Sequence, residues 1–436
     1  MKVIKRNGSE ATFDPKKISS AITKANLSVA ENFRISDEKI EEITKDITNA
    51  AKKAKNDGTV KFTLYGTELQ VKFNPAKRVK VKNGTDEEID KCLAWLDAST
   101  DATLQDCQRI KQEQELCDWA YVKMLDKLSQ TSLGKTNEGV LLMAGLMSRS
   151  GYDVKVARYE KGQLRMLYKS DAFIYNTLFF TLDNQNFFQY GDSLSGAEKV
   201  KIAISFNPGG KKVDLSQNPV IKAVKLTEPR TLTSKKNPDF SFTVQVNKNL
   251  VDFYDEMPSF TDGKNFMTRW TTMANRPLDK YLQQTLVKQM KEKLKGKSQK
   301  NQVQQILSWM HGEVDLDMKA TNSNFFLYGY DEDVWGYDRP FYAEQTLFYP
   351  YCDTEDRSIL LSRLVRDVVG IDVVFIYYPE HTAIGVCITD EDVKGAYVVL
   401  NGRHYVICDP TYIGSEVGEE MPSIEGKKRT VMKLER

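Results

Sequence analysis

The chain has 436 residues, which is too long for a single ordinary hydrophobic core, so we expect roughly two to four domains. Its 62 Lys and Arg residues nearly balance 60 Asp and Glu residues, and the net charge of +2 gives no argument for nucleic acid or membrane binding. No run of 18 apolar residues predicts a transmembrane helix. The first eight residues lack the apolar stretch of a secretory signal. Six cysteines without metal-type spacing favour free thiols, no metal site and a cytoplasmic location.

Residues 1–55 are predicted to form a small αβ unit. A short strand leads into Asn7-Gly8, a dipeptide typical of tight hairpins. Asp14-Pro15 is typical of a helix start with proline at the first position, and Ser36 is placed to cap a second helix. The sequence therefore predicts a hairpin followed by two helices.

This unit resembles the first half of an ATP-cone, the allosteric nucleotide-binding domain of ribonucleotide reductases. In that family the basic residues of the hairpin and first helix contact phosphates, which implies such roles for Lys5, Arg6 and Lys17. The closing helices of the family are absent after residue 55, so we expect no cofactor, with ATP bound weakly or not at all. A basic αβ cap on the next domain is the alternative. The resemblance rests on Val3-Ile4-Lys5-Arg6-Asn7-Gly8, Phe13-Asp14, Lys17-Ile18 and Ala21-Ile22.

Residues 56–199 and 200–275 are predicted as two further domains. In the first, a helix followed by strands and a hairpin recurs later in the chain, where Leu141–Val154 corresponds to Leu360–Val373. In this register Lys135 takes the place of Thr354, and no His follows. We interpret 56–199 as an α+β segment that includes a degenerate copy of the last domain, without its chemistry. Residues 200–275 alternate as strands between turns, which predicts a β-rich domain.

The last predicted domain, 276–436, carries the residues with chemical potential. A capping pattern at Asp353 and Asp356 predicts a helix that begins near Thr354. His381 precedes one predicted strand and Asp409 ends another. A nucleophile position at a helix start, then a His, then an Asp is the order of a papain-like thiol site, in which the imidazole is the base and the carboxylate orients it.

This ordered set resembles the transglutaminase-like superfamily, closest to its Bacteroidetes-type proteins. The resemblance implies an α+β, papain-like core in which a Cys attacks a glutamine or peptide carbonyl, with His381 as base and Asp409 as its partner. The family places that Cys directly before the Glu, where this chain has Thr354, and the nearest Cys is Cys352. The matching runs are Glu355-Asp356-Arg357, His381 and Asp409-Pro410-Thr411-Tyr412.

A Thr hydroxyl is a far weaker nucleophile than a thiolate, so we expect a protein that binds protein or peptide substrates, or acts on them weakly. Cys352 serves as nucleophile only if the helix begins earlier, and is otherwise a small buried residue. Two alternatives stay open: a non-catalytic pseudoenzyme module that binds peptides or proteins, and a nucleotide-responsive regulatory protein. Relatives of the last domain are often exported, which conflicts with a cytoplasmic location. His311 and His404 fall outside the pattern.

Overall fold

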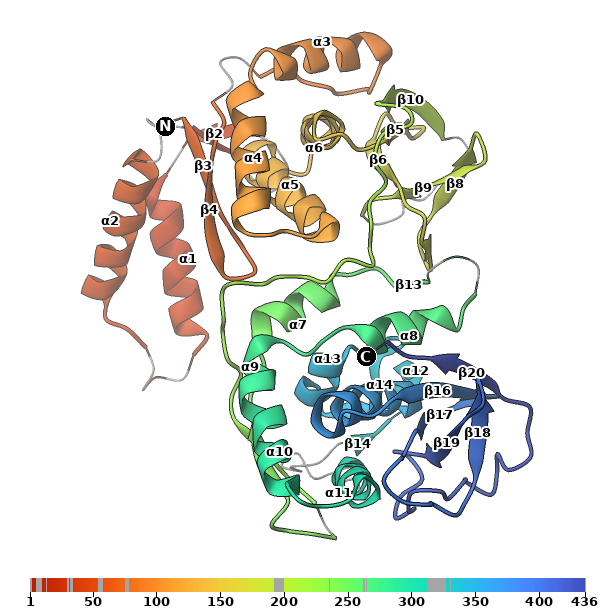
Figure 1. Cartoon of the computed structure of the whole chain (residues 1–436). Helices are drawn as coiled ribbons and strands as arrows, with labels where there is room; N and C mark the ends of the chain where they lie inside the picture. The colour runs from red at the N-terminus through yellow and green to blue at the C-terminus, as the bar shows by residue number, and fades with distance from the viewer. Residues whose placement is uncertain are drawn as a thin grey trace. The chain divides into compact units, whose positions relative to one another are not determined.

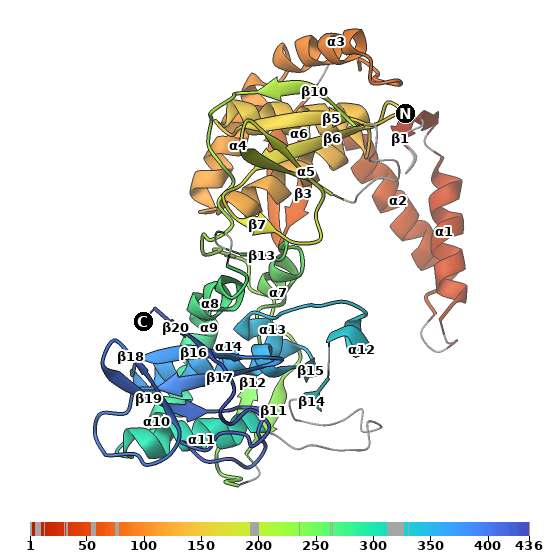
Figure 2. The same cartoon turned by 90° about the vertical axis from the view of Figure 1, so that its right-hand side faces the viewer.

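The computed structural model of the chain describes residues 2–4, 10–12, 14–29, 31, 34–53, 58–74, 78–191, 200–234, 236–261, 263, 265–311, 327–329 and 331–435. The chain forms two compact units, one of residues 1–170 and 177–214 and one of residues 171–176 and 215–436. Each unit packs helices beside a mainly antiparallel sheet, so the α+β class is confirmed (Figures 1 and 2). No helix among the described residues is long and apolar enough to cross a membrane.

The N-terminal segment has the predicted hairpin and two helices. Strands β1 (Lys2–Ile4) and β2 (Glu10–Thr12) pair antiparallel. Helix α1 (Pro15–Leu27) begins after Asp14, whose carboxylate accepts a hydrogen bond from the Lys16 amide at 3.0 Å. Helix α2 (Asp37–Lys53) begins after Ser36. These starts follow from local capping, because a short polar side chain satisfies helix amides that have no intrahelical partner.

The rest of the first unit places helices against a five-stranded antiparallel sheet, with strand order β10-β5-β6-β9-β8. A hairpin of β3 and β4 precedes the helices and packs against α5 and α4. Helix α6 contacts the two central strands, β5 and β6. The elements are β3 (Thr59–Leu64), β4 (Thr67–Lys72), α3 (Asp86–Asp97), α4 (Asp101–Glu113), α5 (Asp118–Leu133), α6 (Asn137–Arg149), β5 (Val154–Arg158), β6 (Leu164–Lys169), β8 (Phe179–Leu182), β9 (Gln185–Gln189) and β10 (Lys201–Phe206).

The second unit begins with small paired strands and helices and ends in its own five-stranded sheet, with order β18-β19-β17-β16-β20. Helix α14 packs mainly on β17. The early elements are β7 (Phe173–Ile174), β11 (Arg230–Thr233), β12 (Ser241–Val244), α7 (Lys248–Asp255), β13 (Phe260–Thr261), α8 (Thr268–Asn275), α9 (Lys280–Leu282), α10 (Lys288–Leu294) and α11 (Gln299–His311). The later ones are β14 (Leu327–Tyr328), α12 (Asp331–Trp335), α13 (Ala343–Phe348), β15 (Tyr351–Cys352), α14 (Thr354–Leu364), β16 (Val373–Tyr378), β17 (His381–Val386), β18 (Tyr397–Leu400), β19 (Arg403–Cys408) and β20 (Thr430–Lys433).

The two large sheets have the same topology. In each, a helix leads into a central hairpin, which is β5–β6 in the first unit and β16–β17 in the second. The next hairpin, β8–β9 or β18–β19, adds its second strand to the outer side of β6 or β17. A final strand, β10 or β20, returns to pair with β5 or β16. All eight pairings are antiparallel, so the faint sequence repeat corresponds to one strand order used twice.

The segment 200–275 contributes to both units. Its first strand, β10, completes the sheet of the first unit, and the remainder includes the β11–β12 hairpin and two helices of the second unit. The four-domain division stays a prediction beside these two units.

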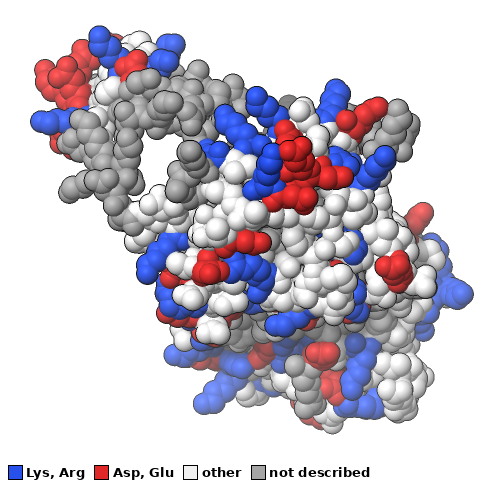
Figure 3. All heavy atoms as spheres, turned by 90° about the horizontal axis from the view of Figure 1, so that it is seen from above, with Lys and Arg blue, Asp and Glu red and all other residues white. Residues whose placement is uncertain are grey.

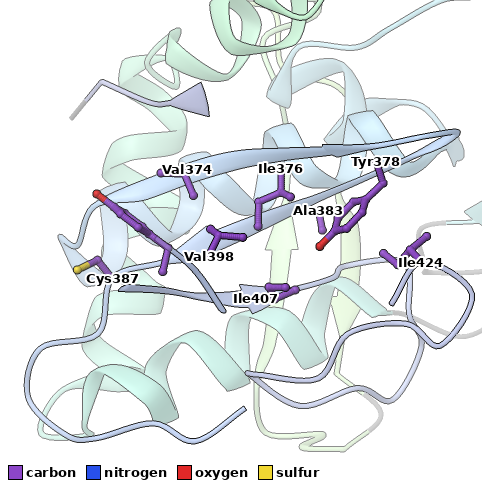
Figure 4. Packing of buried hydrophobic residues seen from close by; sticks show 9 residues of the cluster. Val374, Ile376, Tyr378, Ala383, Cys387, Val398, Ile407 and Ile424 are labelled. Carbon is purple, nitrogen blue, oxygen red and sulfur yellow. The ribbon is translucent and has the colours of Figure 1, made fainter. Parts of the chain in front are cut away.

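One face of the second sheet packs a cluster of buried side chains from four strands and from Ile424 (Figure 4). Each fully buried Val or Ile of such a cluster contributes roughly 1.5–3 kcal/mol to stability. A Cβ at Gly385 would lie 2.8 Å from Val374 Cγ2 and 2.9 Å from Tyr405 Cβ, so only glycine fits between these neighbours. The strands are thereby held in close register, which fixes the ends of β17 and β19. The labelled members are Val374, Ile376, Tyr378, Ala383, Cys387, Val398, Ile407 and Ile424.

Charges of both signs are interspersed over the face of the molecule seen in Figure 3, in keeping with a net charge of only +2. On that face, among the residues drawn in colour, neither sign covers a continuous surface of the kind that steers long polyanions.

Candidate functional site

Helix α14 begins at the predicted residue. Asp353 is its N-cap, and its carboxylate accepts hydrogen bonds from the Glu355 amide at 3.1 Å and the Asp356 amide at 3.3 Å. Asp356 returns the contact by accepting from the Asp353 amide. Thr354 is therefore the first helical residue, 8% exposed, at a helix end whose amides favour negative charge.

The Thr354 hydroxyl is engaged within its own turn. Its Oγ1 donates to Glu355 Oε2 at 2.6 Å. Among the described residues no hydrogen bond joins Thr354 to His381. In this state the hydroxyl is bonded to a carboxylate and not to the imidazole of His381.

His381 and Asp409 are brought together from adjacent strands. His381 opens β17, and Asp409 directly follows β19, its partner in the sheet. His381 Nε2 lies 2.7 Å from Asp409 Oδ2, with the carboxylate fully buried and the imidazole 8% exposed. With Nε2–H donating to the carboxylate, Nδ1 is the ring nitrogen left to accept a proton, and within the described part of the chain it has no hydrogen-bond partner. This is the tautomer that a papain-like base requires.

Asp409 is held by its own turn as well as by the imidazole. Its Oδ1 accepts from the Thr411 amide, the Thr411 hydroxyl and the Tyr412 amide, at 2.9, 2.7 and 3.1 Å. Burial acts to raise the pKa of this carboxyl. The hydrogen bond and charge of His381, together with the hydrogen bonds from Thr411, outweigh burial and hold the pKa below its usual value. The sequence run Asp409-Pro410-Thr411-Tyr412 thus encodes a preorganised acceptor for the imidazole.

Cys352 is buried ahead of the helix start. It lies in β15, before the helix, and is 1% exposed. Its Sγ accepts a hydrogen bond from Arg357 Nε at 3.4 Å. Burial raises the pKa of the Cys352 thiol to about 11, although Arg357 acts in the opposite direction. A thiol of that pKa is almost entirely protonated at neutral pH and is a poor nucleophile.

Arg357 ties the helix start to the turn after Asp409. This side chain is 1% exposed, and besides its contact with Cys352 its Nη1 donates to the Pro410 carbonyl at 3.5 Å. The next residue, Ser358, donates from its Oγ to the Thr382 carbonyl at 3.3 Å. Thr354 precedes Ser358 by four residues and so shares its helix face. The first turn of α14 is therefore held beside the first residues of β17.

Carboxyl groups gather beneath the helix start. Asp356 is fully buried and accepts from the Phe341 amide at 2.7 Å. Burial first, and then the charges of neighbouring carboxylates, raise the pKa of both Asp353 and Asp356. The helix start therefore carries less negative charge at neutral pH than its sequence indicates.

His311 belongs to this region, although the sequence pattern excluded it. It ends α11, is 4% exposed, and its Nε2 lies 3.2 Å from the Asp409 carbonyl, while the Gly414 amide donates to its Nδ1 at 3.4 Å. Burial lowers the pKa of His311 to about 4, so the ring is neutral at pH 7. Its contacts are with two backbone atoms and with the Ser415 hydroxyl, all about 100 residues away in sequence, and no sequence signal marks them.

The predicted phosphate-contacting residues are only partly within the described chain. Lys17 lies on α1 and is exposed. Lys5 and Arg6 lie outside the described residues. Across the described ranges no group of three or more His, Cys, Asp or Glu side chains is arranged to hold a metal ion.

Comparison with known proteins bears on the N-terminal segment. A search of curated proteins and a search of solved structures returned no match for the chain. One family model matches, that of the ATP cone domain, and it extends eight residues past the boundary expected from the sequence. Residues 1–63 of this chain match the ATP cone domain.

Proposed function

We propose that residues 276–436 are a papain-like, transglutaminase-type module that binds protein or peptide substrates and has lost most or all of its acyl-transfer activity. The observation that carries the proposal is the His381–Asp409 pair, 2.7 Å apart at the ends of adjacent strands, beside a helix that begins at Thr354. An oriented imidazole with a free Nδ1 is the base of this kind of thiol site. It opens β17, the strand on which α14 packs, although the contact with Ser358 of α14 comes from the neighbouring Thr382.

The loss of activity follows from the two residues nearest the nucleophile position. Thr354 supplies a hydroxyl that already donates to Glu355. Unlike a thiol, a hydroxyl is not deprotonated to its nucleophilic anion near neutral pH. Cys352 supplies a thiol, but burial raises its pKa to about 11 and Arg357 contacts its sulfur. The base is therefore present without a group that it can activate efficiently.

A groove near the helix start supports the binding half of the proposal. Its volume is about 470 Å³, and apolar side chains of Val244, Leu347 and Phe348 line it beside Lys225 and Arg230. Arg230 is close enough to Cys352 to influence it electrostatically. An apolar groove with a few fixed charges suits a peptide segment, since apolar area supplies affinity and the charges set orientation.

The test is turnover of a glutamine-containing peptide, followed as hydroxylamine incorporation and as hydrolysis. We expect no turnover above background for the wild type and measurable turnover for Thr354→Cys, lost again in Thr354→Cys with His381→Ala. Cys387→Ser, which changes another buried thiol of the same unit, is the matched control. Wild-type turnover abolished by Cys352→Ser, but not by Cys387→Ser, would move the nucleophile to Cys352 and overturn the proposal.

A nucleotide-responsive function is the second candidate, and the match of residues 1–63 to the ATP cone domain favours it. Lys17 is exposed on α1, where a phosphate could reach it. Because the residues after α2 form the β3–β4 hairpin rather than further helices, we propose at most weak ATP binding. Calorimetric titration with ATP decides between a regulatory unit and a basic cap.

A further inference from the structure

The first unit has a cavity at the place that corresponds, in strand order, to the His381–Asp409 site. Its volume is about 320 Å³, within the range of small-molecule sites. Residues at the start of α6, at the start of β6 and just after β9 line it, as the start of α14, the start of β17 and the end of β19 carry Thr354, His381 and Asp409. The lining residues used below are Asp126, Ser129, Lys135, Asn137, Arg165 and Met166.

We propose that this cavity binds a free α-amino acid with an apolar side chain. The repeat that lacks a His–Asp pair would thus be a ligand site rather than an empty copy. This inference is independent of the function proposed for residues 276–436.

Two cations at the mouth of the cavity suit the carboxylate of such a ligand. Lys135 is exposed and Arg165 is half-buried, and both line the cavity. Arg165 donates to its neighbouring Leu164 carbonyl, and across the described residues neither cation forms an ion pair with a carboxylate. A guanidinium and an ammonium without acidic partners are available to a carboxylate ligand.

The start of α6 adds to this positive end. The helix has 13 residues, and Asn137, its first residue, lines the cavity. The Asn137 side chain is fully used, because it donates to the Val81 and Gly162 carbonyls and accepts from the Leu164 amide. The helix end is thus fixed against the β5–β6 loop, with its dipole directed toward the anion.

Another part of the lining, from α5, suits an ammonium group. Asp126, on α5, has its carboxylate bonded by the Gln130 amide at 2.8 Å and, in the described chain, no cationic partner. Ser129, one turn along α5, is 2% exposed, lines the cavity, and its Oγ has no hydrogen-bond partner within the described residues. A buried hydroxyl without a partner costs free energy. Because Oγ is itself shielded in this structure, a ligand bonds it only after the Ser129 side chain rotates toward the cavity.

Apolar residues complete the lining. Val140, Met143 and Met166 contribute to the wall, and the methionines add a flexible surface that adapts to an aliphatic side chain. The lining therefore includes two cations, a carboxylate and an apolar part of the wall. A zwitterion with an aliphatic side chain satisfies all three.

The test uses the whole chain labelled with ¹³C at the methionine methyl groups, titrated with L-leucine and with 4-methylpentanoate, its counterpart without the amino group. We expect L-leucine to shift the Met143 and Met166 resonances saturably. We expect 4-methylpentanoate to bind at least about tenfold more weakly, the effect of losing one charge-assisted hydrogen bond. Equal affinity for the two compounds would overturn the zwitterion assignment.

Variants locate the two ends of the ligand. Arg165→Gln combined with Lys135→Gln should weaken both compounds more than about tenfold, whereas Asp126→Asn should weaken L-leucine alone. Ser129→Ala should leave the free protein at least as stable and weaken L-leucine, a combination that a purely structural serine would not produce. Lys127→Gln, an exposed change on the same helix, is the control. Absence of shifts with L-leucine, or shifts unchanged in the double variant, would overturn the proposal.

Discussion

The two large sheets have the same strand order but form two different sites. In the second unit the order places His381 beside Asp409, at 2.7 Å, whereas in the first the equivalent strand ends carry no such pair and line a cavity. The difference lies in side chains and not in topology. A helix that leads into an antiparallel sheet brings its own start and two strand ends together, and the residues at those three places decide what the site does.

The first residue of each helix makes this contrast concrete. Asn137 bonds the backbone at three points and so serves the fold of the first unit. Among the described residues the Thr354 side chain bonds the carboxylate of its neighbour and no backbone group, so it contributes little to the fold. A position with few structural ties is one at which a nucleophile can be gained or lost at low cost in stability.

The largest expected effect is at Arg357. Arg357→Met should destabilise the second unit by about 2–4 kcal/mol, because it leaves the buried Pro410 carbonyl without its donor and removes the contact to Cys352. The position four residues into α6 is the half-buried Val140, and Val140→Ala should cost about 1 kcal/mol. Chemical denaturation of the two variants measures both, and equal losses would contradict the difference drawn between the two helices.

His311 should make the stability of the second unit depend on pH. Burial lowers its folded-state pKa to about 4, against about 6.5 when unfolded, so the unfolded state binds the extra proton between these values. The contribution of neutral His311 to the free energy of unfolding is fully present above pH ~6.5. It is lost as the pH falls toward 4, by up to about 3 kcal/mol. Urea unfolding followed by fluorescence of the neighbouring Trp309 measures it.

The control for that experiment is His404, which is exposed and stacks on Tyr397. The stability difference between wild type and His311→Gln should vary between pH 4 and 6.5, whereas the difference between wild type and His404→Gln should not vary with pH. The raised pKa values of Asp353 and Asp356 are common to all three proteins and cancel in these differences. A wild-type minus His311→Gln difference that does not vary with pH would assign the effect to another group.

A smaller effect is expected from the helix starts themselves. Asn137→Ala should cost about 1–3 kcal/mol, because three buried backbone groups lose a partner. Thr354→Ala should cost less than about 1 kcal/mol. Thermal unfolding of the two variants checks the order, and a Thr354→Ala loss as large as that of Asn137→Ala would show that Thr354 is structural.

The smallest expected signal concerns nucleotide. Calorimetric titration of the whole chain with ATP should give weak heats or none, because the β3–β4 hairpin follows α2 where an ATP-cone has closing helices. Micromolar binding lost in Lys5→Ala with Arg6→Ala would contradict this and favour the regulatory function.

What could be predicted from the sequence was mostly local. The starts of α1, α2 and α14 follow from Asp14, Ser36 and Asp353, since capping involves neighbouring residues. The His381–Asp409 contact was found through residue order along the chain. The pairing of β10 with β5, the contact of His311 with the Asp409 backbone and the cavity in the first unit depend on tertiary packing between distant segments, which no local pattern encodes.

The central claim is that His381 still serves the position of Thr354, and thiol pKa values test it most directly. Three variants are alkylated with iodoacetamide across a pH series. They are Thr354→Cys, Thr354→Cys with His381→Ala, and Lys135→Cys, at the position that the sequence repeat aligns with Thr354. The wild-type thiols give the background, which should be low because burial raises the pKa values of Cys92, Cys107, Cys352 and Cys408.

We expect a pKa well below the ordinary ~8.5 at position 354, a smaller lowering at position 135, where only Arg165 and the start of α6 act, and a return toward 8.5 at position 354 when His381 is removed. The opposite result, a thiol pKa at position 354 that does not depend on His381, would follow if the imidazole faces away from α14. His381 shares its sheet face with Ala383 and Asp409, and the neighbouring Thr382 is the residue whose hydroxyl lies 3.5 Å from Ser358 of α14. A pKa at position 354 that is unchanged by His381→Ala would contradict the account and make the His381–Asp409 pair a structural feature of the sheet.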